Sequence, residues 1–495
     1  MTRQETRRTY RSRTALLSAI VGVMGVAPVA FAQRAAWPVD RDGRSLHDEY
    51  IGPSDWVPAF RDDVRRGRIP SGAGRLARIG PVAPGAPARG SPGCVTPAQI
   101  FPFEDSAGIL LTNFSTDDLI TLMADAAGAL LAANGDNYDF VGYWLNFDPN
   151  HTIGAAFYLG IFNDVSGIGD PSGSGDPLFD FRSDLGLPTD KIQGWVMMWN
   201  VNSGFWQAGD GSGADFTRLA LGQEFEHRFA MFLPNLLDGR RLQGDNGSCG
   251  RSAHWNWRVD GQGSAMEISN WIGSSPAVLS QSFVTFNTDI PGGVDSYTDL
   301  YLMGYVSPAE MDAGNSELRY MNNSSCAATY SGPISDFSSA DIIAAAGPRV
   351  PDSSAAQKNF RTAWIMFHRP GDPPSAAELD KAVGILNQHQ ADWQLSTLGR
   401  GVMDDTIFDD CNCNGVPDAD DIASGTSADV NGDGIPDECA CPADIDGDGD
   451  ADVADFFAFV AAFAAGDPVA DVNGDGTIDV RDFFAFVTVF SVGCV

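Results

Sequence analysis

One short segment, residues 219–233, carries side chains suited to metal-dependent hydrolysis. It reads LALGQEFEHRFAMFL. In the pattern H-E-x-x-H, two imidazoles four residues apart share one helix face and bind Zn²⁺, while the Glu polarises the bound water. Here Gln223 and His227 occupy the ligand positions and Glu224 occupies the position of the general base.

The first ligand position departs from that pattern. Gln223 offers an amide oxygen, which is a poor Zn²⁺ ligand beside imidazole. Glu226 adds a carboxylate, but on a helix it points about 100° away from His227. Three interpretations remain open: a zinc site with a substituted ligand, a site that has lost its metal, and an ordinary amphipathic helix.

Carboxylates dominate the C-terminal region. From Asp404 to Val495 there are 22 Asp and Glu residues and one Arg, Arg481, in a chain of net charge −34. Phosphate binding needs clustered Lys and Arg, so a nucleic-acid partner is excluded. Such a block is either a solvated tail or a calcium-binding one.

An internal repeat favours the calcium-binding alternative. Residues 444–463 and 471–490 are identical at 13 of 20 positions, and both fit a twelve-residue loop with oxygen ligands at positions 1, 3, 5, 7, 9 and 12. The first loop offers Asp444, Asp446, Asp448, the Asp450 carbonyl, Asp452 and Asp455. The second offers Asp471, Asn473, Asp475, the Thr477 carbonyl, Asp479 and Asp482.

Two more loops of this kind precede the repeat. The first offers Asp410, Asn412, Asn414, Asp418 and Asp421. The second offers Asp429, Asn431, Asp433 and Asp437, with Ala440 at its twelfth position and therefore without the usual bidentate carboxylate. We expect calcium here too, in a spacer that loosens without the ion because its carboxylates repel one another.

Apolar spacing predicts the elements that position these side chains. Helices are expected at 114–135, capped by Ser115 or Thr116, at 215–233, capped by Asp215 or Thr217, and at 375–397. Strands are expected at 138–147, 154–164 and 192–202. Strands that lead into the helix of Gln223 and His227 indicate a mixed α/β or α+β core.

The N-terminus has the pattern of an export signal. Residues 1–32 combine a basic start with a short apolar stretch and end in Ala30-Phe31-Ala32, which is typical of cleavage; an uncleaved membrane anchor is the alternative. Residues 33–93 are expected to be a pro-segment or flexible linker. After cleavage no transmembrane helix is expected, so the mature chain is secreted, periplasmic or on the cell surface. The eight cysteines then favour disulfides over metal binding.

The order of several motifs resembles a family of secreted bacterial zincin-like proteins. Around the Gln223–His227 segment lie "YDFV", "AFYLGIFNDVSGIG" and "QGWVMMWN" upstream, and "AHW" and "TDLYLMG" downstream, over roughly residues 100–408. The resemblance implies a twisted sheet over an active-site helix, followed by a mainly helical lower part.

Residue by residue, the resemblance implies that Glu224 is the general base and His227 the second zinc ligand. His254 and Asp299 match family positions. Metzincin spacing would need a His where the chain has Leu233, so His254, Glu267 or Asp299 must supply any third ligand. Because Gln223 replaces the first ligand, an inactive zincin-like domain is the preferred interpretation and an active zinc metallopeptidase the alternative.

The final repeat resembles dockerin modules, because position 12 is Asp and only the helix after each loop is apparent. Dockerins usually bind a cohesin partner, and the ending "SVGCV" resembles that of GC-type dockerins, which are thought to anchor or sort proteins at the cell surface. The "FFAFV" face of each unit is expected to be mostly core, with a partner surface as the alternative. The loops at 409–441 resemble thrombospondin type 3 repeats.

These motifs divide the chain into a signal peptide (1–32), a linker (33–93), an α+β zincin-like domain (94–408), calcium repeats (409–441) and a small α module with two calcium loops (442–495). Ca²⁺ is the expected cofactor, with Zn²⁺ in the alternative, and a cohesin-like or cell-surface partner is expected. A third class of function is a glycoside hydrolase in polysaccharide catabolism, because dockerins often accompany glycosidases, although no carboxylate pair is marked by the sequence.

Overall fold

The computed structural model describes residues 50–51 and most of 93–490. The residues outside the description after residue 93 are 173–174, 205, 209–211, 231, 235–253, 256–258, 261–263, 267–269, 273–276, 281–295, 315–317, 322–328, 429–433, 435, 437–438, 440–442, 444, 446–452, 471, 473–476 and 491–495. The predicted signal peptide and nearly all of the predicted linker lie outside the described residues.

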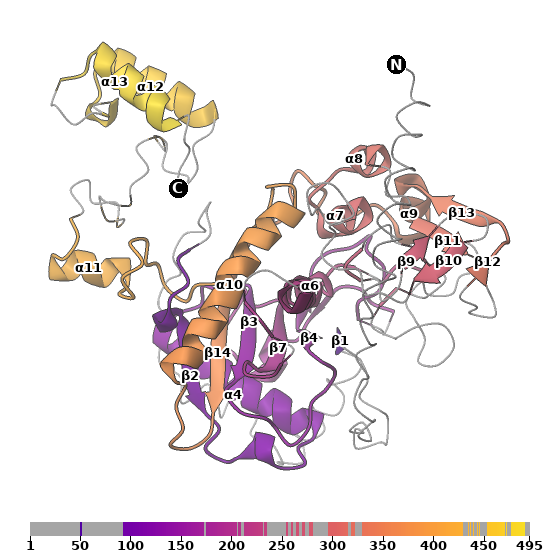
Figure 1. Ribbon diagram of the computed structural model, residues 1–495. Helices are drawn as coiled ribbons and strands as arrows, with labels where there is room; N and C mark the ends of the chain where they lie inside the picture. Colours follow the sequence, from indigo (N-terminus) through magenta and orange to yellow (C-terminus); the bar gives the residue numbers. More distant parts are fainter. Residues whose placement is uncertain are drawn as a thin grey trace, which may run out of the picture.

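A seven-stranded mixed sheet forms the centre of the main domain (Figure 1). Its strands follow the order β1 (Tyr50–Ile51), β4 (Phe157–Gly160), β7 (Gly194–Asn200), β3 (Phe140–Leu145), β14 (Asn359–His368) and β15 (Val402–Asp404), and β2 (Ile100–Glu104) also pairs with β14. The β4–β7 pair is antiparallel and the other pairs are parallel. The predicted strands are confirmed as β3, β4 and β7, and the α+β class is confirmed with them.

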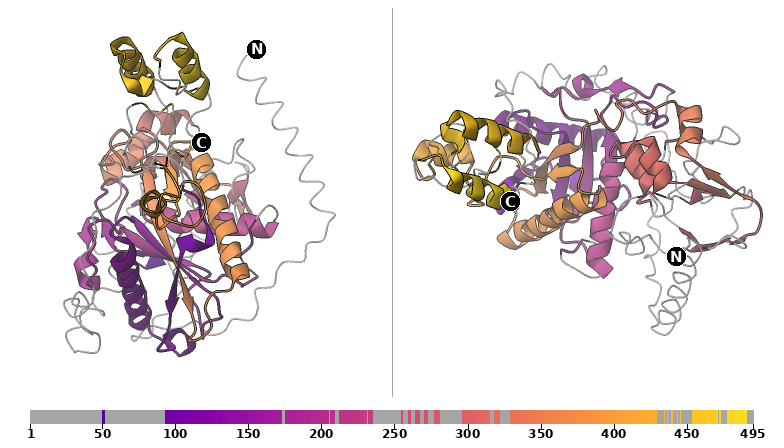
Figure 2. Two further views of the ribbon diagram at one scale, coloured as in Figure 1. Left: turned by 90° about the vertical axis from the view of Figure 1, so that its left-hand side faces the viewer. Right: turned by 90° about the horizontal axis from the view of Figure 1, so that it is seen from above.

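Helices cover both faces of this sheet (Figure 2). Strands β3 and β7 are buried along their whole length, as the continuous apolar runs "FVGYWL" and "GWVMMWN" require. Alternate side chains of β3 therefore enter two cores. Val141, Tyr143 and Leu145 pack with α4 (Thr116–Asn134), whereas Phe140 and Trp144 pack with α6 (Ser212–Glu226) and α10 (Ala376–Ser396).

The two long flanking helices begin where the sequence places them. The Ser115 hydroxyl accepts the Asp118 backbone N–H at 3.2 Å, and the Asp118 carboxylate accepts the Ser115 N–H at 2.9 Å. Helix α10 begins after Ser375, whose N–H donates to Glu378 at 2.8 Å. These reciprocal contacts satisfy backbone donors that a helix end leaves unpaired.

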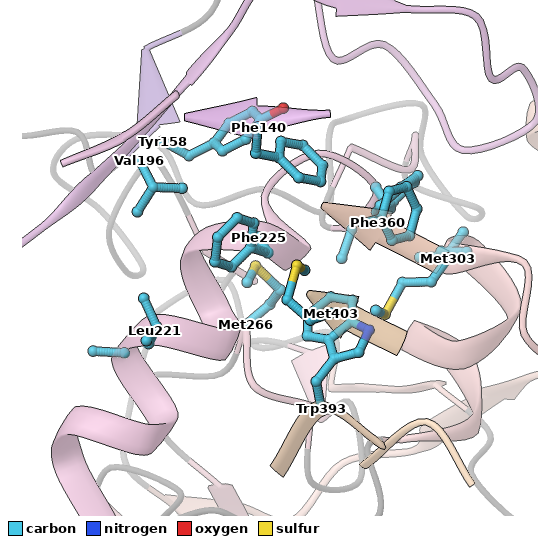
Figure 3. Packing of buried hydrophobic residues seen from close by; sticks show 14 of the residues in the cluster. Phe140, Tyr158, Val196, Leu221, Phe225, Met266, Met303, Phe360, Trp393 and Met403 are labelled. Atoms are coloured by element: carbon cyan, nitrogen blue, oxygen red, sulfur yellow. The ribbon is translucent and has the colours of Figure 1, made fainter. Parts of the chain in front are cut away.

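Helix α6 differs from its predicted bounds at both ends. It begins at Ser212, so Asp215 and Thr217 lie inside the helix and do not cap it. It ends at Glu226 because the hydrogen bonds change from the α-helical to the 3-10 pattern. The Arg228 N–H donates to the carbonyl of Phe225, three residues earlier, at 3.2 Å. The residues after Glu226 enter the core as a turn, and the ring of Phe225 faces Phe140 at a centroid distance of 5.2 Å (Figure 3).

Short elements complete the main domain. Between the long elements lie η1 (Pro97–Gln99), η2 (Ile109–Leu111), α5 (Arg182–Leu185), α7 (Tyr297–Met303), α8 (Pro308–Ala313) and α9 (Ser339–Ala346), together with the small sheets β5 (Phe162–Asn163)–β6 (Phe179–Asp180), β12 (Thr329–Tyr330)–β10 (Ala277–Ser280)–β9 (Asn270–Ile272) and β13 (Ile334–Phe337)–β11 (Leu318–Met321)–β8 (Val259–Asp260). In the described part of the chain, no helix is both long and apolar enough to cross a membrane.

The C-terminal region contains α11 (Asp418–Ser424), α12 (Val453–Ala465), η3 (Pro468–Ala470) and α13 (Val480–Phe490). Helices α12 and α13 pack through Phe459 and Phe486, whose rings stack in parallel with centroids 4.1 Å apart. These two residues are equivalent positions of the internal repeat, so the two copies build one shared core.

Candidate metal sites

The C-terminal end of α6 holds the predicted hydrolytic side chains. His227 follows the last helical residue, but its N–H still donates to the Gln223 carbonyl at 3.1 Å. The i and i+4 relation of Gln223 and His227 is therefore retained. Glu224, Glu226 and His227 are all buried, so this end of the helix places three ionisable groups away from solvent.

His254 reaches the same place from a distant segment. Its Nε2 lies 2.8 Å from Nε2 of Gln223, and its ring centroid lies 5.5 Å from that of His227 at an angle of 71°. The structure thus brings Gln223, His227 and His254 together. The nitrogen of His254 that faces the helix is engaged in a hydrogen bond to the Gln223 amide.

Asp299 lies on α7 and is completely buried. It faces the turn 264–266, where the Ser264 hydroxyl accepts the indole N–H of Trp255 at 2.9 Å. Burial raises the pKa of Asp299 to about 6, although the hydroxyls of Ser264 and Ser296 and the Ala265 N–H partly oppose the rise. Trp255 directly follows His254, so the segment of His254 and Asp299 both contact Ser264.

These donors do not fit Zn²⁺. A structural or catalytic zinc site needs at least three strong protein ligands. Among the residues that the structure describes, no three His, Cys, Asp or Glu side chains gather closely enough to hold a metal ion. Glu267, a predicted alternative for the third ligand, lies outside the described residues. Within the described residues, the cluster around Gln223 is therefore a buried polar site without a complete zinc-binding set.

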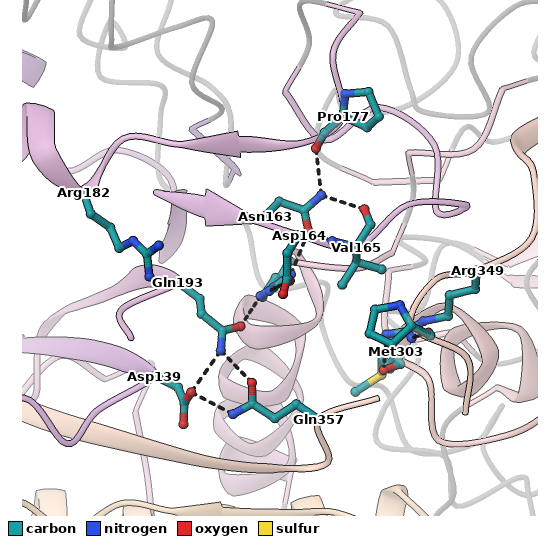
Figure 4. Close-up of polar contacts among 12 residues, drawn as sticks. Asp139, Asn163, Asp164, Val165, Pro177, Arg182, Gln193, Met303, Arg349 and Gln357 are labelled. Carbon is teal, nitrogen blue, oxygen red and sulfur yellow. Dashed lines mark hydrogen bonds and ion pairs between the residues drawn. The ribbon is translucent and has the colours of Figure 1, made fainter. Parts of the chain in front are cut away.

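A polar network that the sequence did not reveal anchors this helix end (Figure 4). Buried Arg228 donates to Oε1 of Gln193, to Oδ1 of Asn163 at 2.8 Å and to Oδ1 of Asp164 at 3.1 Å. Gln193 donates onward to Asp139 at 2.9 Å, and burial raises the pKa of Asp139. The partners are far apart in sequence, which explains why no local pattern pointed to them.

A second unpredicted pair lies behind α6. His389, expected to be a core or surface residue, is buried and places Nδ1 at 2.8 Å from Oδ2 of Asp405. Oδ1 of Asp405 accepts the indole N–H of Trp364 at 2.7 Å. The imidazole stacks on Phe225 at 5.2 Å. His389 is thus a core histidine that packs against the helix of Gln223 and Glu224.

The predicted calcium loop at 410–421 is described completely, and hydrogen bonds join its two ends. The Asn412 and Asn414 amides donate to Oδ2 of Asp421 at 3.2 and 2.7 Å. The Asp410 carboxylate accepts the N–H groups of Asn414 and Gly415 at 3.0 and 2.8 Å. Predicted ligands from both ends of the loop therefore meet.

The residue types of this loop are those that Ca²⁺ binds, since the ion takes six to eight carboxylate, amide and carbonyl oxygens. In the described structure, however, no three of its carboxylates lie close enough together to hold a metal ion. Asp410, Asp418 and Asp421 are buried within one short loop. Each of the Asn412 and Asn414 side-chain amides also has an oxygen. A 180° flip of the amide would present that oxygen to a cation.

The final two loops are described only in part. Asp455 and Asp482, the residues predicted at position 12, are both completely buried. Asp455 accepts the N–H of Ile445 at 2.7 Å, so its carboxylate folds back to the start of its loop. Asp479 pairs with Arg481 at 2.9 Å, and Thr477 is exposed. The other predicted ligands of these loops lie outside the described residues, as do Asp429, Asn431, Asp433 and Asp437.

Two disulfides secure the region. Cys94 pairs with Cys413 and Cys411 pairs with Cys439. The C-x-C motif at 411–413 therefore forms two disulfides, as the preference for disulfides over metal binding predicts. Cys249, Cys326, Cys441 and Cys494 lie outside the described residues.

Comparison with known proteins gives no relative. No protein-family model matches the chain, and neither the curated proteins nor the solved structures yield a match.

Proposed function

We propose that the chain is an exported calcium-binding protein whose zincin-like domain has lost its catalytic metal. The observation that carries this proposal is the contact between Gln223 and His254 at 2.8 Å. An amide in place of the first imidazole removes one strong ligand and also occupies Nε2 of a neighbouring histidine. The buried Glu224 then has no metal-bound water to polarise.

The calcium part of the proposal is supported by the 410–421 loop. Asn412 and Asn414 both donate to the buried Asp421, and the Asn414 N–H donates to the buried Asp410. Two predicted carboxylate ligands and two amides therefore belong to one closed loop, and their residue types are those that bind Ca²⁺. The buried Asp455 and Asp482 support two further sites in the C-terminal module.

The C-terminal module is proposed to bind a cohesin-like or cell-surface partner. Phe456 and Phe459 of the first "FFAFV" segment belong to the cluster between α12 and α13, but Phe457 and its repeat equivalent Phe484 are 66% and 63% exposed. Val453, Val460, Val480 and Val487 are also exposed at repeat-equivalent positions. Such apolar residues on a small module favour a partner surface.

Export is supported by the signal-like N-terminus and by the disulfides. Disulfides persist in oxidising compartments and are rare in the cytosol. The Cys94–Cys413 and Cys411–Cys439 bonds are therefore consistent with an extracytoplasmic protein.

Metal analysis of the purified mature protein tests the proposal. We expect bound calcium that a chelator removes and no stoichiometric zinc. Stoichiometric zinc, together with casein cleavage that Glu224→Gln abolishes, would establish the active zinc metallopeptidase instead. Release of reducing sugar from polysaccharides would favour the glycoside hydrolase.

A further inference from the structure

A small pocket lies between α6, α10 and the residues that follow β7, and His389 is part of its lining. We infer that this pocket binds the hydroxyl group of a slim aliphatic ligand, with the His389 imidazole as the hydrogen-bond acceptor. The inference goes beyond the proposed calcium-binding function and does not depend on it.

The polar group of the pocket is held in a defined protonation pattern. Nδ1 of His389 lies 2.8 Å from Oδ2 of Asp405, whose other oxygen accepts the Trp364 indole N–H at 2.7 Å. An ionised carboxylate only accepts hydrogen bonds, so Nδ1 carries the proton of the neutral ring and Nε2 carries the lone pair. Among the described residues, Nε2 of His389 has no hydrogen-bond partner.

Aromatic contacts hold the His389 ring in this orientation. The imidazole stacks on Phe225 with ring centroids 5.2 Å apart and meets the Trp393 ring edge-on at 6.1 Å. His389 is only 3% exposed. A buried acceptor that is left unpaired costs free energy, so a ligand that donates a proton to Nε2 gains what the protein itself does not supply.

The walls of the pocket suit an aliphatic stem. Leu221 of α6 and Ile385 of α10 line it and are both buried. Leu221 lies one helical turn before Phe225 (Figure 3). Ala208 and Gln388 also line the pocket and are exposed and half-buried, respectively, so the pocket opens to solvent beside them.

The size of the pocket limits what can enter. It leaves about 10 Å³ for the centre of a water-sized group, which is room for one water molecule or one hydroxyl. The hydroxyl of a ligand would therefore occupy the inside, its methylene groups would contact Leu221 and Ile385, and any larger part would stay at the mouth. Carbonyl and nitrile groups are excluded as donors because they carry no proton.

Nuclear magnetic resonance of the full-length mature protein, labelled with ¹⁵N at histidine, tests this inference with ethanol as the probe. We expect a saturable shift of the His389 Nε2 resonance. For a ligand of three non-hydrogen atoms, the dissociation constant should be about 1 mM or weaker. Acetonitrile is the matched control compound, since it is equally slim but cannot donate a hydrogen bond, and it should leave this resonance unchanged.

A matched pair of variants locates the binding site. Ala208→Leu places a larger side chain at the exposed mouth of the pocket and should abolish the saturable shift. Ala391→Leu makes the same change at an exposed position of α10 outside the pocket lining and should bind ethanol as the wild type does.

Asp405→Asn tests the role of the carboxylate. The new amide can donate to Nδ1, which moves the ring proton to Nε2 and removes the acceptor. We expect the ¹⁵N spectrum to show the other tautomer of His389 and ethanol binding to be lost. Should this buried change prevent folding, the two alanine variants decide alone.

Two results would overturn the inference. If ethanol leaves the Nε2 resonance of His389 unchanged, the pocket takes up water only. If acetonitrile shifts the resonance as ethanol does, or if Ala208→Leu binds ethanol as the wild type does, the response does not come from a hydroxyl group in this pocket.

Discussion

At the scale of single residues, Gln223 decides what the end of α6 can do. Its side chain sits at 2.8 Å from Nε2 of His254, where a metal-binding helix would present an imidazole. The remaining parts of such a site, Glu224 and His227, are retained and buried. In the proposed zincin-like site, the loss is therefore confined to the first ligand and to Nε2 of His254, which the Gln223 amide contacts.

Gln223→His should create zinc binding where the wild type has none. The new imidazole would share a helix face with His227 and would lie beside His254, which gives three strong ligands. We expect about one zinc ion per chain by elemental analysis after dialysis. Gln223→Ala is the matched control and should bind none. Equal zinc in the wild type and in both variants would show that Gln223 does not determine metal binding.

Asp299 should make the folded protein less stable as the pH rises. Its pKa is raised from 3.8 to about 6 by burial, so the folded state retains a proton that the unfolded chain loses. The protonated form favours folding below about pH 4, and this contribution is lost as the pH rises through 6. Removing it should change the free energy of unfolding by about 3 kcal/mol at most.

The test compares denaturant unfolding of the wild type and of Asp299→Asn at pH 4.5 and pH 7.5. The wild type should lose about 2 kcal/mol more than the variant over this interval. Exposed Asp176, changed to Asn, serves as the control and should follow the wild type. A variant with the same pH dependence as the wild type would contradict the assignment to Asp299.

At the scale of elements, α6 is held in place by polar contacts at its end and apolar contacts along its length. Phe225 packs between Phe140 and the His389 ring, while Arg228 ties the following turn to β5 and to the segment before β7. The apolar spacing of the sequence predicts the helix and the strands beneath it. It does not predict the end of α6, because Arg228 and its partners determine that end.

Arg228→Met should destabilise the main domain by about 3 kcal/mol. The change removes the donor to the buried Oε1 of Gln193 and one of the two donors to Oδ1 of Asn163, which also accepts the Val165 N–H at 3.2 Å. Arg369→Met is the matched control, because Arg369 pairs with Asp372 at the surface, where an ion pair contributes about 1 kcal/mol or less. Thermal unfolding measures both. Similar losses in both variants would show that the buried network does not stabilise the domain.

Residues of a candidate site could be predicted from the sequence where they lie close together in the chain. The repeat spacing identified Asp410, Asn414 and Asp421 as members of one loop, because all ligands of such a loop lie within twelve residues. The contact between Gln223 and His254 is only one of several arrangements that the sequence predicts, because 31 residues separate them. The pairing of His389 with Asp405 depends on the packing of α10 against the sheet. No short sequence motif predicts that packing.

At the scale of the whole molecule, the Cys94–Cys413 disulfide connects two predicted domains, whereas Cys411–Cys439 lies within one of them. Cys94–Cys413 closes a loop of 319 residues, and Cys411–Cys439 closes one of 28. In the chain-entropy model these loops correspond to about 6 and about 4 kcal/mol of stabilisation, respectively. The long connection therefore stabilises the main domain as well as the segment 409–441.

Replacing Cys94 and Cys413 together by Ser should lower the midpoint of thermal unfolding of the α+β domain more than replacing Cys411 and Cys439. The first pair restricts nearly the whole unfolded domain, whereas the second restricts only a short segment. Differential scanning calorimetry in calcium measures both changes. The opposite order would show that the long connection does not restrain the unfolded domain.

The hydrogen bond between Gln223 and His254 also has a genetic consequence. Glutamine and histidine codons differ only in their third base, so one nucleotide change converts either residue into the other. Gln223 is therefore one mutation away from a histidine. Without metal, that change would place an imidazole against the imidazole of His254 in a buried site and remove the amide that now contacts it. Selection for a stable fold would then retain the glutamine wherever zinc is not used.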